Sequence, residues 1–156
     1  MVDERGGHAD RASGAGEASR RELEPALFTG VAHNTSGIDG ESWVDGGLRV
    51  RVASPTAEDR GGATNPEELL ALSWATCLNA AARVVAGPGV EVEVDAEISL
   101  HRRSTGEGFE FSGRARLRFP GKTAAESEEL AAAAHARCPV SRMLSGESRI
   151  EVVAIV

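Results

Sequence analysis

The sequence predicts an α+β domain with the element order β-β-β-α-β-β-α-β, in which antiparallel sheets surround a buried central helix. Short stretches of alternating apolar and polar residues, separated by turn residues, are typical of antiparallel strands. A long stretch that begins at Pro66 is apolar on almost all sides, which is typical of a helix inside a protein. A capping box at 123–126 predicts a second helix. Helices that interrupt runs of strands indicate the α+β class.

Length and charge narrow the possible classes of protein. The chain has 156 residues and a net charge of -7, so we expect one domain with no nucleic-acid partner and no membrane partner. We find neither a signal peptide nor an apolar run long enough to span a membrane, and therefore expect a cytoplasmic protein. Residues 1–25 are rich in Gly, Ala, Ser and charge, which predicts a flexible tail before a domain at 26–156.

Three strands are predicted at the start of the domain. Apolar residues alternate over 26–32, and turn residues follow that segment. A short strand at 42–44 ends at Asp45-Gly46-Gly47, which is a strong hairpin signal. The third strand, 48–52, alternates valine and leucine with arginine, as expected for a half-buried strand.

The central helix has clear start and stop signals. Thr64 or Asn65 is suited to the N-cap, and Pro66 to the first helical position. Glycines around Pro88 predict that the helix ends near residue 87.

The second half of the domain is predicted as a hairpin, a helix and a final strand. The hairpin strands are 90–100 and 109–119, the helix runs to about Arg137, and the strand is Arg149–Val156. Basic residues of one hairpin strand face acidic residues of the other, which favours cross-strand ion pairs. These residues are Arg114, Arg116 and Arg118, and Glu91, Glu93 and Glu97.

The chain has two cysteines, Cys77 and Cys138, and no C-x-x-C pair, which excludes a zinc ribbon and a thioredoxin-type motif. Two interpretations remain from the residues alone. The cysteines are either small buried apolar side chains or a reactive pair of an attacking thiolate and a resolving thiol.

Two motifs place the chain beside a known family. The segment A-T-N-P-E-E-L-L at 63–70 is followed by A-T-C at 75–77, and C-P-V-S stands at 138–141. Together they resemble the OsmC/Ohr family of osmotically inducible and organic hydroperoxide resistance proteins, over residues 27–156. The resemblance implies an OsmC/Ohr-like fold and an intertwined homodimer.

The resemblance also implies a chemistry. It implies a cysteine-based peroxidase that reduces organic and fatty-acid hydroperoxides to alcohols and is re-reduced by a dithiol such as a lipoyl protein. Cys77 would form a sulfenic acid, and Cys138 would resolve it to a Cys77–Cys138 disulfide, so the two thiols should adjoin in the fold. Glu67 stands where the family has a glutamate that, with an arginine, holds the thiolate. No cofactor or metal of its own is implied.

The sequence differs from the family at the position of the arginine that holds the thiolate. Ile38 occupies the first-turn position at which the Ohr branch has arginine. We expect Arg60 to substitute for it, because the loop at 59–63 contains two glycines and leads directly to the helix start, where Arg60 could pair with Glu67. Arg49 and Arg51 are the alternatives on the preceding strand.

The spacing of Glu67 and Cys77 favours a dimer. In one unbroken helix these residues lie about 15 Å apart along the axis, too far for the glutamate to organise the thiolate of its own subunit. Either the helix bends, or the glutamate reaches the partner's cysteine, which predicts sites at the subunit interface.

Other functions have less support. A non-catalytic family member that has lost the arginine, and that binds a small molecule or senses redox state, is the principal alternative. Ser73 and Ser141 have no convincing His/Asp arrangement for acyl transfer. His135 and Cys138 lack further ligands for a metal. Trp74 and Met143 are expected to pack in the core or line an apolar pocket.

Overall fold

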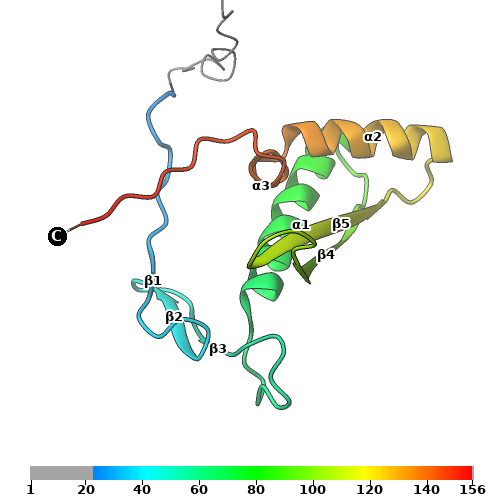
Figure 1. Ribbon diagram of the computed structural model, residues 1–156. Helices are drawn as coiled ribbons and strands as arrows, with labels where there is room; N and C mark the ends of the chain where they lie inside the picture. The colour runs from blue at the N-terminus through cyan, green and yellow to red at the C-terminus, as the bar shows by residue number, and fades with distance from the viewer. Residues whose placement is uncertain (1–22, 156) are drawn as a thin grey trace, which may run out of the picture. The chain divides into compact units, whose positions relative to one another are not determined.

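Figure 1 shows the computed structural model, which describes residues 23–155. The chain divides into two compact units, Met1–Val31 and Ala32–Val156. The described part of the first unit, 23–31, is irregular, and its large apolar side chains are exposed. The tail predicted at 1–25 lies outside the described residues except for its last three.

The second unit contains five strands and three helices within its described residues. Their order is β1 (Ala32–Asn34), β2 (Gly40–Val44), β3 (Arg49–Val52), α1 (Pro66–Ala86), β4 (Glu93–Arg102), β5 (Phe109–Arg118), α2 (Ala124–Arg137) and α3 (Pro139–Leu144). β1–β2–β3 form one antiparallel sheet, and β4–β5 form a separate hairpin. The α+β class and its antiparallel sheets are therefore confirmed.

The first sheet begins later than predicted. Residues 26–31 are irregular, and β1 covers only Ala32–Asn34. The reason lies in the partner strand: Ala32 pairs with Val44, and β2 ends at Val44, so residues before Ala32 have nothing opposite them. The predicted hairpin turn after Val44 is confirmed, with β3 pairing back onto β2.

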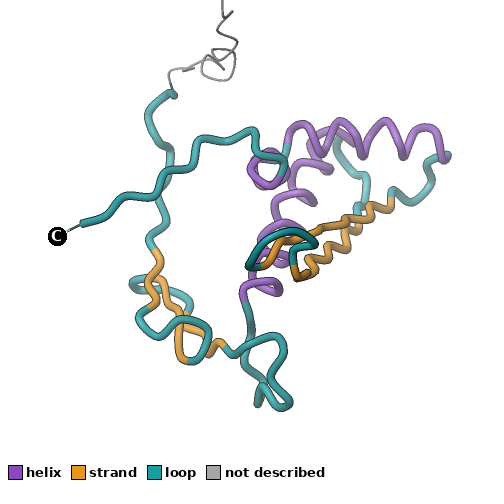
Figure 2. The backbone as a smooth tube through the Cα atoms, in the orientation of Figure 1, coloured by secondary structure: helices purple, strands orange, loops and turns teal. Residues whose placement is uncertain are grey.

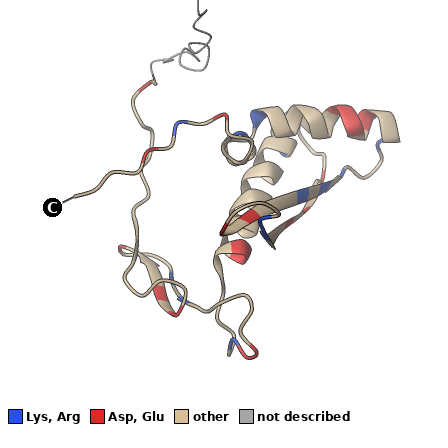
Figure 3. Ribbon diagram, viewed as in Figure 1, with Lys and Arg blue, Asp and Glu red and all other residues tan. Residues whose placement is uncertain are grey.

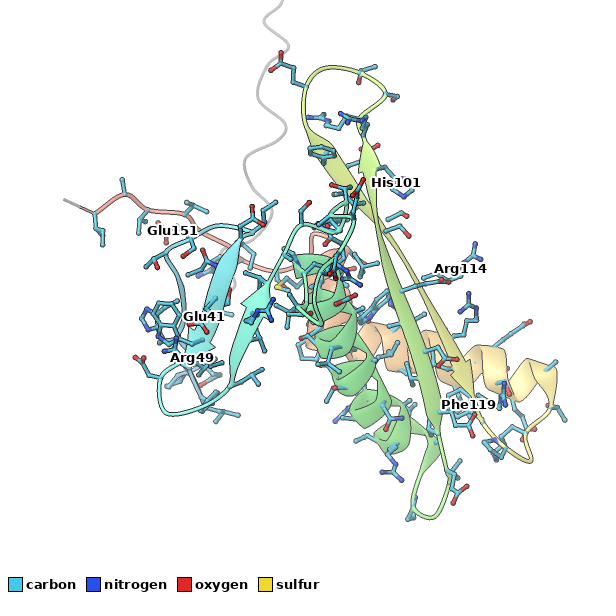
Figure 4. The ribbon with its side chains drawn as sticks, turned by 90° about the horizontal axis from the view of Figure 1, so that it is seen from below. Glu41, Arg49, His101, Arg114, Phe119 and Glu151 are labelled. Atoms are coloured by element: carbon cyan, nitrogen blue, oxygen red, sulfur yellow. The ribbon has the colours of Figure 1, made fainter. Side chains whose placement is uncertain are left out.

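The β4–β5 hairpin has one apolar and one charged face. Val94, Ala96 and Ile98 on β4 pack toward the core that includes α1. The opposite face holds the predicted ion pairs, Arg116 with Glu97 and Arg118 with Glu93. Arg114, on that same face, points away from α1 (Figure 4).

Helix α1 is the element against which most of the second unit packs. Asn65 is its N-cap and accepts a hydrogen bond from the Glu68 backbone N–H at 2.8 Å, and Gly87 ends it, as predicted. It contacts β4, α2 and α3. Its buried side chains are Trp74, Leu78, Ala81 and Ala82, which join Val92, Phe119, Ala134 and Cys138 in the core.

The cover over α1 is incomplete in one chain, and the sequence predicts that this helix is buried either inside the protein or inside a dimer. Leu72 is 63% exposed and Val84 59% exposed. The helix carries charged side chains only near its two ends (Figure 3). Helix α1 is long and apolar enough to cross a membrane. The core helices of soluble proteins meet the same criteria of length and composition. An apolar helix with exposed leucine and valine needs further cover.

The chain after α2 differs from the prediction. A short helix, α3, follows Cys138, because Pro139 starts a new helix as well as ending the old one. The predicted last strand, Arg149–Val156, is irregular up to Ile155, the last described residue (Figure 2). A strand requires a pairing edge, and this segment joins neither sheet. Its apolar side chains remain exposed, namely Ile150, Val152, Val153 and Ile155.

Candidate active site

The fold brings the two cysteines together. Cys77 lies in the middle of α1 and is partly exposed, whereas Cys138 lies at the junction of α2 and α3 and is fully buried. Both helices pack on α1, and the two thiols lie close enough for each to shift the pKa of the other. The prediction that these residues adjoin, although they lie 61 positions apart in the sequence, is confirmed. Cys77 is therefore the thiol that solvent can reach, and Cys138 is the buried thiol next to it.

Backbone groups at the start of α3 surround the sulfur atoms. Cys138 is the N-cap of α3, and its Sγ accepts a hydrogen bond from the Ser141 backbone N–H at 3.4 Å. The backbone N–H of Val140 acts to lower the pKa of both Cys77 and Cys138. The C-P-x-S spacing therefore places two N–H donors beside a pair of thiols.

The pKa values of the two thiols shift in opposite directions. Burial raises the pKa of Cys77. The Val140 backbone N–H acts against burial, and Cys138 adds a still smaller effect that raises the pKa further. Burial also acts to raise the pKa of Cys138, but hydrogen bonds from the Ser141 hydroxyl and backbone N–H and from Cys77 outweigh it and lower that pKa. Cys138 is therefore the more acidic thiol of this chain by itself.

Two residues of the site were not recognised from the sequence. The Trp74 indole Nε1–H donates to Ser141 Oγ at 2.8 Å, and both side chains are buried. The sequence predicts that Trp74 packs in the core, which its 7% exposure confirms, and it places Ser141 in the C-P-V-S motif without assigning it a contact. The signal that could have identified the serine is its position three residues after Cys138, the spacing of an N-cap contact.

The structure does not bring Arg60 to Cys77 of the same chain. Arg60 Nη1 lies 2.6 Å from Glu68 Oε1, so the expected pairing with Glu67 is wrong. Glu68 also accepts from the Thr64 hydroxyl at 3.0 Å, and these two hydrogen bonds lower its pKa. Because Glu68 precedes Cys77 by nine residues on an unbroken helix, the two lie about 13 Å apart along its axis.

Glu67 faces a cleft at the start of α1. The cleft has a volume of about 580 Å³ and lies between α1, the preceding loop and β4. Glu67 Oε2 is buried there and has no hydrogen-bond partner among residues 23–155. A buried carboxylate oxygen in that state is costly unless a donor reaches it. The apolar lining residues are Pro55, Ala71, Ala96, Ile98 and Leu100.

The alternative arginines are engaged elsewhere. Arg49 forms an ion pair with Glu41 at 2.8 Å across β2 and β3. Figure 4 labels both residues on these neighbouring strands. Arg51 donates to the Gly61 carbonyl at 3.3 Å. Ile38, at the family's arginine position, is 47% exposed in the turn between β1 and β2. Within the described part of the chain, no three His, Cys, Asp or Glu side chains are grouped as metal ligands.

Comparison with known proteins identifies similar sequences. The sequence profile of the OsmC-like protein family matches residues 58–153. The organic hydroperoxide resistance protein OhrA of Bacillus subtilis is 34% identical over 131 residues, which cover 80% of this chain and 93% of that protein. The organic hydroperoxide resistance protein of Xanthomonas axonopodis pv. citri is 32% identical over 134 residues, which cover 79% of this chain and 91% of that protein.

Solved structures share the fold. A crystal structure of an organic hydroperoxide resistance protein from Legionella pneumophila matches with a TM-score of 0.70 and 33% identity, over 79% of this chain and 93% of that one. The structure of OhrB from Bacillus subtilis matches with a TM-score of 0.72 and 29% identity, over 78% and 93% of the respective chains.

Proposed function

This chain belongs to the OsmC-like protein family, and we propose on that basis that it is a thiol-dependent peroxidase that reduces organic hydroperoxides to alcohols. The single observation that supports this chemistry best is the pair of thiols. A partly exposed Cys77 lies beside a buried Cys138, and each thiol shifts the pKa of the other, which is the arrangement that a two-cysteine peroxidase requires. The relatives that match over most of the chain are named for resistance to organic hydroperoxides.

The proposed cycle uses the two thiols in order. The Cys77 thiolate attacks the outer peroxide oxygen, the O–O bond breaks, and the alkoxide takes a proton to leave as the alcohol. Cys77 is then a sulfenic acid. The Cys138 thiolate attacks that sulfur, the S–O bond breaks, and hydroxide leaves as water after it takes a proton. An external dithiol such as a lipoyl protein reduces the disulfide that results.

The activating groups for Cys77 are proposed to come from a second copy of the chain. Glu67 Oε2 is buried without a partner among the described residues. Arg60 pairs with Glu68, which lies about 13 Å along α1 from the cysteine of its own chain. Exposed apolar side chains on α1 and in segment 149–155 also need cover. An intertwined homodimer would meet both needs, and light scattering at micromolar concentration tests for it. A monomer at that concentration would refute the dimer.

The test of the activity is steady-state turnover. We expect the protein to consume tert-butyl hydroperoxide with dihydrolipoamide as reductant, and to consume hydrogen peroxide much more slowly. The apolar lining of the cleft beside Glu67 favours an organic substituent on the peroxide. Absence of turnover with every organic hydroperoxide tried would refute the proposal. The proposed location is the cytoplasm, where dithiol reductants are present.

One observation favours a second candidate function. The pKa of Cys77 is raised, and the groups that set it are burial, Val140 and Cys138, with no arginine among them. A family member with that thiol would react slowly, as a redox-sensing or small-molecule-binding protein. Stoichiometric oxidation of Cys77 without sustained turnover would identify it.

A further inference from the structure

A buried chain of hydrogen bonds connects α1 to the thiol pair. The Trp74 Nε1–H donates to Ser141 Oγ at 2.8 Å, and the Ser141 hydroxyl acts to lower the pKa of Cys138. Trp74 is 7% exposed, and Ser141 and Cys138 are both fully buried. The Ser141 backbone N–H donates to the same sulfur at 3.4 Å.

The direction of this chain of hydrogen bonds is fixed by chemistry. An indole N–H is a donor and never an acceptor, so the serine oxygen must accept from Trp74. The single hydroxyl proton of Ser141 is then free to point at Cys138. A sulfur that receives both the hydroxyl and the backbone N–H of Ser141 is stabilised as a thiolate.

The indole ring has little room to move away. A Cβ at Gly113 on β5 would lie 3.0 Å from Trp74 Cζ3, so the ring packs directly on the backbone of that strand. The other end of the ring is held by Ser141. Strand β5 and helix α3 therefore fix the position of the donor.

We propose that Trp74 and Ser141 are positioning residues that make Cys138 the resolving thiolate and the leaving sulfur of the catalytic pair. The assignment rests on the proposed peroxidase cycle. In the resolving step, Cys138 attacks the sulfenic sulfur of Cys77 as a thiolate held by Ser141. In the reducing step, the external dithiol attacks Cys77, the accessible sulfur, and the S–S bond breaks with its electron pair on Cys138.

The first test measures the Cys138 thiolate without any peroxide. In a Cys77→Ser background Cys138 is the chain's only thiol, and the chain contains no tyrosine, so ultraviolet absorbance reports the thiolate as pH rises. Ser141→Ala removes the hydroxyl but keeps the backbone N–H. We expect the ratio of thiolate to thiol at fixed pH to fall about tenfold, the effect of one hydrogen bond to a charged group. Trp43→Phe, a tryptophan on β2, is the control and should leave the ratio unchanged.

The second test measures the resolving step with both cysteines present. After one equivalent of tert-butyl hydroperoxide, Ser141→Ala should form the disulfide about tenfold more slowly, a larger change than in the rate of Cys77 oxidation. If the parent protein shows no Cys77 oxidation, the peroxidase proposal fails, and the absorbance titration still decides the role of Ser141.

The inference is overturned if, in the Cys77→Ser background, the titration of the Cys138 thiol is the same with and without Ser141→Ala. If Ser141→Ala does not fold, Trp74→Phe decides, because it keeps the hydroxyl and removes only the donor behind it. That variant should lower the thiolate ratio several-fold relative to Trp43→Phe. Equal titrations for the two tryptophan variants would overturn the role of Trp74.

Discussion

Gly113→Ala tests whether the contact between β5 and the Trp74 ring fixes the geometry of the site. The new Cβ would lie 3.0 Å from Trp74 Cζ3, 3.0 Å from Ile98 Cδ1 and 3.5 Å from the Glu97 carbonyl oxygen. The end of the Ile98 side chain can rotate away. The indole ring can only move as a whole, and its Nε1–H is bonded to Ser141.

The cost of this substitution is set by overpacking. Extra carbon in a well-packed core costs about 1–3 kcal/mol of unfolding free energy. Gly47→Ala is a matched control, because a Cβ there would lie 3.5 Å from Val44 Cγ1, an ordinary contact. We expect Gly113→Ala to be about 1–3 kcal/mol less stable than Gly47→Ala, and to form the disulfide more slowly as the indole is displaced from Ser141.

Urea unfolding followed by circular dichroism, at one protein concentration for both variants, measures the difference. Equal unfolding free energies would show that the ring moves without cost. In that case Gly113 does not position Trp74, and the reasoning from the close approach fails.

Three further predictions concern stability and activity. The pKa of Glu126 is lowered below its ordinary value of 4.5 by its bonds to Thr123, so its contribution to stability is complete above that value and is lost as pH falls through the lower folded pKa. The unfolding free energy of Glu126→Gln should therefore fall less steeply with decreasing pH than that of the control variant, Glu128→Gln. Leu78→Ala should cost about 2–5 kcal/mol in urea unfolding, because Leu78 is 1% exposed. Arg60→Met should lower peroxide turnover roughly 100-fold if Arg60 serves the partner's thiolate, and an unchanged rate would exclude that role.

Elements specified by local signals were predicted well from the sequence. Asn65 and Pro66 start α1 and Gly87 ends it, and the glycine turn after Asp45 closes the β2–β3 hairpin. These signals depend on a few adjacent residues, so they can be recognised without knowledge of the fold. The family motifs likewise identified Cys77 and Cys138 as the thiol pair.

Features that depend on distant residues were predicted less well. The start of β1 depends on where β2 ends, and a strand at 149–155 depends on pairing with another strand, whereas this segment joins neither sheet. The Trp74–Ser141 hydrogen bond joins residues 67 positions apart, so no local spacing indicates it. Arg60 pairs with Glu68 and not with Glu67, because adjacent helical residues point about 100° apart, and only the loop conformation decides which one it meets.

The central claim, that Cys77 is oxidised by an organic hydroperoxide and Cys138 resolves it, is tested most directly by a single-turnover thiol count. Fully reduced protein is mixed with one equivalent of tert-butyl hydroperoxide, and free thiols are counted over time in the parent, Cys77→Ser and Cys138→Ser. We predict that the parent loses both thiols to a disulfide, that Cys138→Ser forms a sulfenic acid trapped by dimedone at Cys77, and that Cys77→Ser keeps its thiol. A parent that keeps both thiols, or a Cys77→Ser protein that loses its thiol as fast as the parent does, would contradict the claim.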